Sequence, residues 1–149
     1  MSLQDRLRED LKVALKQRDT GRLSIVRVLL AECKNAEIAK QCALDDSGVV
    51  EVLGREARRR KESIDAFRAG NRPDLVVEEE AALAVITGYL PEQMSRDELV
   101  AVVREVVAEV QPTGPGDKGR VMSQLMPKVK GKASGKDVND IVVELLAGL

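Results

Sequence analysis

The stretch SRDELVAVVREVVAEV, residues 95–110, decides the fold class. Its apolar residues recur at the spacing of a single helix face: Leu99, Val102, Val103, Val106, Val107 and Val110. Ser95 followed by Glu98 is a capping-box sequence. In such a box the serine hydroxyl accepts a hydrogen bond from the N3 amide, and the glutamate side chain accepts one from the serine amide. Because valine is a mediocre helix former, we expect burial of this face to hold the helix in place.

The same periodicity recurs outward from this stretch, and the alternation typical of strands hardly appears. Turn and cap signals predict four helices before it and two after it, over about residues 3–18, 22–40, 49–69, 73–90, 118–129 and 135–146. In the first helix we expect a buried stripe of Leu3, Leu7, Leu11 and Leu15. Gly54 and Gly88 fall inside predicted helices, and Pro127 should strain or end the sixth.

Composition supports a helical protein of 149 residues, because 44% of them are hydrophobic and the only aromatic rings are Phe67 and Tyr89. An aliphatic, alanine-rich core favours packed helices over a β-sandwich. We therefore predict an all-α protein with a four-helix N-terminal part and a small three-helix C-terminal bundle. The joint YLPEQMS places the boundary between an N-terminal helical domain, residues 1–94, and a C-terminal tail domain, residues 95–149.

Several site classes are excluded by the residues present. The chain has no histidine, so neither a Cys–His nor a Ser–His–Asp constellation can form. Cys33 and Cys42 lie nine residues apart, which suits neither a redox pair nor a metal knuckle, and we expect both to be buried small hydrophobes. We predict no catalytic residue, no metal site and no cofactor. The charged N-terminus and the lack of a long apolar run predict a protein outside the membrane, and we expect it in the cytoplasm.

The charge pattern supplies the main functional signal. The chain as a whole has 24 basic and 25 acidic residues, but the stretch KGRVMSQLMPKVKGKASGK, residues 118–136, contains six basic residues and no acid. A local basic strip with glycines predicts a surface that meets the phosphates of RNA. The candidate RNA-binding residues are Lys118, Gly119, Arg120, Lys128, Lys130, Gly131, Lys132 and Lys136. The strip could also be an ordinary solvated surface or a contact for a protein partner.

A second basic cluster, on the predicted third helix, gives Arg55 and Arg59 as possible secondary RNA contacts. Acidic residues are interleaved with these arginines, and Glu51 stands four residues before Arg55. That spacing is also typical of a solvated helix face with internal ion pairs.

The joint YLPEQMSRDEL, followed by KGRVMSQLMPKVKGKASGKDVND, resembles the GatB/YqeY domain family and specifically its stand-alone YqeY-like members. The N-terminal SLQDRLREDLKVALKQRDTGRLSIVRVLLAECKNAEI and the segment REARRRKESIDAFRAGNRPDLVVEEEAAL extend the resemblance over essentially the whole chain. It implies an all-helical protein whose tail is similar to the C-terminal domain of the B subunit of the glutamine-dependent tRNA amidotransferase. In that enzyme the tail domain contacts the tRNA.

Three functions are consistent with these observations. The protein could be a tRNA-binding adaptor, acting alone or with an amidotransferase or other aminoacyl-tRNA machinery. It could instead be a protein-interaction module that binds an enzyme subunit. A carbon–nitrogen ligase using glutamine as amide donor would need a nucleophile and a nucleotide site, and the sequence shows neither a glycine-rich phosphate loop nor a Ser–Ser–Lys arrangement. We therefore expect any link to ligase chemistry to come through a catalytic partner.

Overall fold

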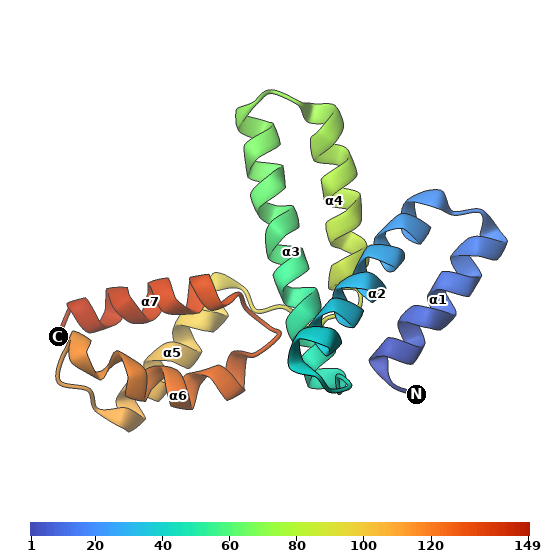
Figure 1. Cartoon of the computed structure of the whole chain (residues 1–149). Helices are drawn as coiled ribbons and strands as arrows, with labels where there is room; N and C mark the ends of the chain where they lie inside the picture. Colours follow the sequence, from blue (N-terminus) through green and yellow to red (C-terminus); the bar gives the residue numbers. More distant parts are fainter. The chain divides into compact units, whose positions relative to one another are not determined.

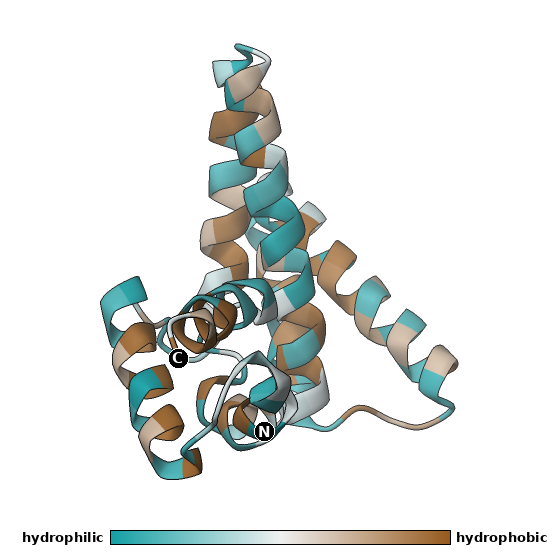
Figure 2. Cartoon of the chain, turned by 90° about the vertical axis from the view of Figure 1, so that its left-hand side faces the viewer, coloured by the Kyte–Doolittle hydropathy of each residue, from teal (hydrophilic) through white to brown (hydrophobic).

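The computed structural model describes all 149 residues, and the fold is all-helical with no strand, which confirms the predicted fold class. Its helices are α1 (Leu3–Gln17), α2 (Thr20–Lys40), α3 (Asp46–Ala69), α4 (Pro73–Thr87), α5 (Arg96–Val110), the short 3₁₀ helix η1 (Pro115–Asp117), α6 (Lys118–Val129) and α7 (Gly135–Ala147) (Figure 1). Bands of hydrophilic and hydrophobic residues alternate along these helices (Figure 2), as amphipathic packing requires.

The chain divides into two compact units, Met1–Pro91 and Glu92–Leu149. The predicted domains, residues 1–94 and 95–149, stay a prediction about how the chain folds. We describe each unit by itself.

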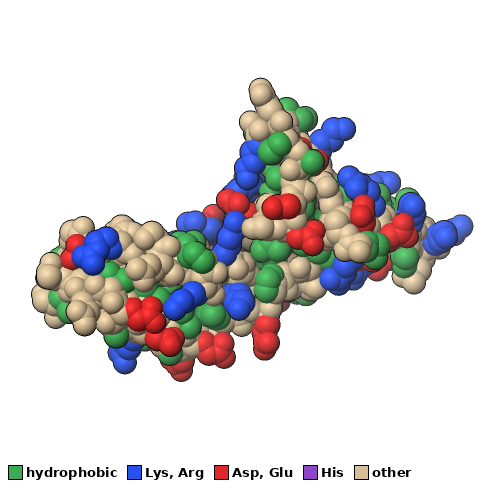
Figure 3. Space-filling view, turned by 90° about the horizontal axis from the view of Figure 1, so that it is seen from below, with side chains coloured by type: hydrophobic (Ala, Val, Ile, Leu, Met, Phe, Trp, Pro, Cys, Tyr) green, Lys and Arg blue, Asp and Glu red, His purple; other side chains and the backbone are tan.

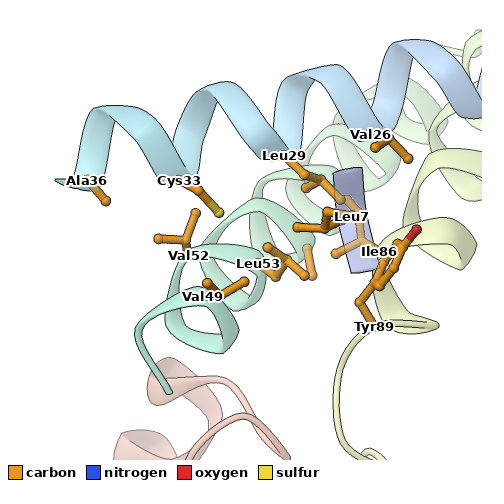
Figure 4. Close-up of a cluster of buried hydrophobic side chains, with 11 residues drawn as sticks. Leu7, Val26, Leu29, Cys33, Ala36, Val49, Val52, Leu53, Ile86 and Tyr89 are labelled. Carbon is orange, nitrogen blue, oxygen red and sulfur yellow. The ribbon is translucent and has the colours of Figure 1, made fainter. Parts of the chain in front are cut away.

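In unit Met1–Pro91, α1 packs along α2 and α3 packs along α4, and each pair forms a helical hairpin (Figure 1). The two hairpins meet around a core to which all four helices contribute (Figure 4). The buried members of this core are Leu7, Val26, Leu29, Cys33, Ala36, Val49, Val52, Leu53, Ala57, Ile86 and Tyr89. The core is therefore almost entirely aliphatic, as the composition predicted.

Tyr89, just after α4, ties the end of the second hairpin to α1. Its hydroxyl donates a short hydrogen bond to the carboxylate of Asp10, and the Arg6 guanidinium carbon lies 4.8 Å from the centre of its ring. Burial and the hydrogen bond to Asp10 raise the pKa of the Tyr89 hydroxyl. The tyrosine is therefore a donor to Asp10 at neutral pH.

A buried acid on α3, Glu56, pairs with two arginines that reach the neighbouring helices α2 and α4. Its carboxylate accepts from Arg59 Nη1 and from Arg60 Nε, both at 3.2 Å. Arg60 also reaches Glu79 on α4 at 3.2 Å, and Arg59 reaches Glu32 on α2 at 3.7 Å. A carboxylate this buried needs such partners, because an unpaired charge in the interior is strongly destabilising. The network therefore fixes α3 against both of its neighbours.

In unit Glu92–Leu149, α5 packs against α6 and α7, and α6 packs against α7. The core of this unit consists of Leu99, Val103, Val106, Val110, Val121, Leu125, Val129, Val138, Ile141, Val142 and Leu146. Each predicted inward position of α5 is buried or partly buried, so the face read from residues 95–110 is confirmed.

Serine side chains cap three of the helices. Ser2 and Asp5 form a complete capping box, with Asp5 N donating to Ser2 Oγ at 3.1 Å. At the predicted capping box Ser95 Oγ accepts from Glu98 N at 3.2 Å, but the return bond from Ser95 N to the Glu98 side chain is not formed. Ser134 Oγ accepts from Asp137 N at 3.1 Å. Each bond satisfies an amide that has no partner within its helix.

Three local expectations are wrong. Leu15 is 49% exposed, and Ala14 is the buried residue at that end of α1. Residue Gly88 is not inside a helix, because α4 ends at Thr87 and Gly88 caps it. Of the two cysteines Cys33 is buried, but Cys42 is exposed in the turn after α2. Pro127, expected to strain or end the sixth helix, does not end it, and α6 runs to Val129, the predicted last residue.

Candidate nucleic-acid interface

Unit Glu92–Leu149 divides the predicted basic strip between the two ends of α6. Lys118, Gly119 and Arg120 form the first turn of this helix, whereas Lys128, Lys130, Gly131 and Lys132 lie at or just after its end. A helix of 12 residues is about 18 Å long. The basic strip is continuous in the sequence, but the length of α6 separates it into two clusters in space. We call them the start cluster (residues 118–120) and the end cluster (residues 128–136), the second including Lys136 in the first turn of α7.

The start cluster is partly committed to holding the fold. Arg120 pairs with Asp117 at 3.4 Å and donates from Nη2 to the carbonyl of Val110 at 3.3 Å, at the end of α5. Asp117 accepts from the backbone and the hydroxyl of Thr113, at 2.8 and 3.0 Å. These bonds lower the pKa of the Asp117 carboxyl. Arg120 therefore joins the loop before α6 to α5, whereas a Cβ at Gly119 would meet open space.

The end cluster stands on a turn whose backbone is anchored to residues before α5. Gly131 adopts a left-handed conformation with φ 77°, which glycine accepts without strain. Its carbonyl accepts from Gln93 Nε2 at 2.7 Å, and the carbonyl of Lys132 accepts from Met94 N at 2.8 Å. The turn that presents the lysines is therefore held in one conformation.

The lysine side chains of the end cluster point to solvent. Lys128, Lys130, Lys132 and Lys136 are all exposed. Lys128 lies 3.8 Å from the Glu109 carboxylate, a contact that is weak because both groups are exposed. Neither Lys132 nor Lys136 forms an ion pair. Lys136 is in the first turn of α7, where the amide of Asp137 donates to Ser134 Oγ and the Asp137 carboxylate lies in the same turn.

Charge within this unit is strongly segregated. Residues 118–136 contain six basic residues and no acid, whereas the rest of the unit contains nine acids and only Arg96 and Arg104 as bases. On the molecular face drawn in Figure 3, Lys and Arg side chains are interspersed with Asp and Glu side chains. Within this unit the basic residues are therefore concentrated in residues 118–136.

The possible secondary contacts, Arg55 and Arg59, both sit beside acids. Arg55 Nη1 lies 3.9 Å from Glu51, and Arg59 belongs to the network around Glu56. Their role in RNA binding stays a prediction, but their charges are largely balanced within α2 and α3. Part of this network could be predicted, because Glu56 and Arg60 stand four residues apart on one helix. The contacts of the arginines with Glu32 and Glu79 depend on helix packing and could not.

The chain offers few groups for other chemistry. Burial raises the pKa of the Cys33 thiol to about 11, so this cysteine stays protonated at neutral pH. No group of three or more Cys, Asp or Glu side chains is arranged to hold a metal ion. None of the helices combines the length and the apolar character that crossing a membrane requires.

Comparison with known proteins supplies the family. A family model described as Yqey-like protein matches residues 4–146, nearly the whole chain. The chain belongs to the Yqey-like protein family. This confirms the resemblance that the joint and the basic strip indicated.

Curated relatives of this Yqey-like chain are fungal proteins named altered inheritance of mitochondria protein 41, mitochondrial. The protein of Pyrenophora tritici-repentis is 32% identical over 133 residues, covering 86% of this chain and 71% of the relative. That of Lachancea thermotolerans is 32% identical over 134 residues, covering 88% and 70%. That of Saccharomyces cerevisiae is 27% identical over 129 residues, covering 85% and 70%.

These relatives overturn the expected cytoplasmic localisation, because their names place them in mitochondria. The charge of an N-terminal segment does not distinguish the cytoplasm from an organelle.

Proposed function

We propose that this Yqey-like protein is a non-catalytic, tRNA-binding adaptor with two parts, a four-helix N-terminal domain and a three-helix tail that contacts the RNA. The observation that carries the proposal is the end cluster. Four exposed lysines surround a turn whose backbone is anchored by Gln93 and Met94, in a unit whose other charges are mostly acidic. Such segregation directs a polyanion to one end of the unit.

The chemistry of the cluster favours recognition of the RNA backbone. Lysine acts as a point charge and reads phosphate without discriminating bases. The only aromatic residues, Phe67 and Tyr89, belong to unit Met1–Pro91, so the tail has no ring on which an unpaired base could stack. Folded RNA recognised by shape and phosphate position is therefore the expected ligand class.

The resemblance to the tail of the tRNA amidotransferase B subunit supports tRNA over other folded RNAs. In this proposal, any link to amide transfer runs through a catalytic partner. The names of the curated relatives make organellar tRNA a relevant ligand, so it belongs among the RNAs tested.

A charge-removal experiment tests the proposal. The variant Lys132→Gln with Lys136→Gln removes the two end-cluster charges that form no ion pair, and both side chains are exposed. We expect it to keep the wild-type melting temperature. The plot of the logarithm of the RNA association constant against the logarithm of salt concentration should become less steep, its negative slope shrinking in magnitude by between about 1.4 and 1.8, depending on how duplex-like the contacted RNA is. The matched control is Lys34→Gln with Lys40→Gln, which removes two exposed charges from α2.

Equal RNA affinity and an equal slope for wild type and the Lys132/Lys136 variant would overturn the assignment of the end cluster. If wild type itself binds no tRNA, the alternative of a protein-interaction module binding an enzyme subunit takes the place of the adaptor.

A further inference from the structure

Unit Met1–Pro91 contains a groove that the proposed RNA contact does not use. It lies between the start of α2 and the middle of α4, and its volume is about 660 Å³. Apolar residues from both helices line it, namely Ile25, Ala81, Ala82 and Val85. Arg22 of α2 and Glu78 of α4 are among its charged lining residues.

One of the two helices that line the groove, α4, also carries apolar residues on its exposed side. In α4, residues 81–86 read AALAVI; Ala82 and Ile86 are buried in the core of the unit, but Ala81 and Ala84 are exposed. Val77 extends this exposed stripe and is itself 66% exposed. One side of α4 is therefore buried in the unit, whereas the apolar stripe on its other side is covered by nothing in the unit.

The charges of the groove indicate what covers it. Neither Glu78 nor Arg22 forms an ion pair within the chain, although the charge of Arg22 partly offsets the rise in the pKa of the Tyr89 hydroxyl. The two residues belong to different helices, with apolar groove residues also coming from both. A two-fold axis relates the same patch on two copies, so it can bring each glutamate opposite the arginine of the other copy. Alanines at the contact would let the two α4 helices approach closely.

We propose that this groove, together with the Val77–Ala84 stripe of α4, is an isologous interface for a second copy of the chain. The patch is self-complementary: it carries both members of the ion pair and an apolar surface that can pack against itself. The proposal concerns unit Met1–Pro91 and does not depend on RNA binding by the tail.

Sedimentation equilibrium of the full chain tests the proposal over a range of protein concentrations. We expect a mass that rises toward the dimer. Ala81→Glu, an exposed position, should return the monomer mass at every concentration while the melting curve stays cooperative. The control Ala108→Glu makes the same change at an exposed position of α5 and should leave the dimer intact.

A charge exchange tests the pairing itself. Glu78→Arg alone should weaken the dimer about tenfold, since a two-fold interface contains the contact twice and the reversal makes both copies repulsive. Arg22→Glu combined with Glu78→Arg should restore most of the affinity. A monomer at all concentrations would overturn the proposal, and so would a dimer that survives Ala81→Glu. A double variant as weak as the single one would overturn the Arg22–Glu78 pairing.

Discussion

Replacing Val106 by aspartate is expected to unfold α5, α6 and α7 while leaving unit Met1–Pro91 folded. Val106 is fully buried, and it lies in the middle of the apolar face of α5. A carboxylate at this position would meet the surrounding core residues of the tail and no basic group.

The magnitude follows from the size of the unit. A compact unit of roughly 60 residues has a free energy of unfolding of about 3–9 kcal/mol. Losing the buried valine costs about 1.5–3 kcal/mol. Desolvating an unpaired carboxylate costs several kcal/mol more. The sum is comparable to the whole stability of the unit.

Circular dichroism measures the result directly. Helices α5, α6 and α7 contribute 15, 12 and 13 residues, roughly a third of the α-helix in the chain. We expect the helical signal to fall by about that fraction and the remainder to melt cooperatively. The matched control is Val143→Asp in α7, where the side chain is 47% exposed and the signal should be unchanged.

An unaltered melting curve for Val106→Asp would contradict the placement of the buried face. Loss of nearly all of the helical signal would instead contradict the prediction that residues 1–94 fold as a separate domain.

Three further predictions concern single residues. A methyl group at Gly54, inside α3, would meet no atom within 4 Å, whereas at Gly48 it would lie 2.9 Å from Leu44 Cδ2. In denaturant titrations Gly54→Ala should therefore raise the free energy of unfolding by about 0.5–1 kcal/mol and Gly48→Ala should not, and a loss of stability in Gly54→Ala would contradict this. In the native protein at pH 8, a thiol reagent should label Cys42 and spare Cys33, because Cys33 is buried and its pKa of about 11 keeps the thiol protonated. Equally fast labelling of both thiols would show that Cys33 is accessible. Because the pKa of Asp117 is lowered in the folded protein, its contribution to stability is fully present above about pH 4 and is lost as pH falls through the lowered pKa. Asp117→Asn should therefore destabilise the protein at pH 7 and flatten the acid limb of its curve of stability against pH. An unchanged acid limb would contradict that role.

Local sequence patterns were enough to predict most of the fold. The α5 face and the serine caps depend on residues three or four apart, and these contacts form within a single helix turn. The stripe of four leucines in α1 failed for a geometric reason. With 3.6 residues per turn, each step of four advances the face by about 40°, so by Leu15 the stripe has rotated out of the core and Ala14 replaces it.

Features that depend on distant residues could not be read from the sequence. Arg59 and Arg60, which both pair with Glu56, also reach Glu32 on α2 and Glu79 on α4. The Tyr89 hydroxyl bonds to Asp10, which lies 79 residues earlier in the chain. The basic strip was visible as a composition, but its division into start and end clusters follows from α6 lying between them. The groove between α2 and α4 is defined only once the two hairpins have packed.

The measurement that tests the central claim most directly is tRNA binding by the purified full-length protein at two salt concentrations, with double-stranded DNA as the competitor. If all four lysines of the end cluster contact phosphate, a fourfold increase in salt should lower the affinity by about a hundredfold. We predict this salt dependence together with a preference for tRNA over DNA. Failure to bind tRNA even at low salt would contradict the account and leave the end cluster as ordinary solvated surface.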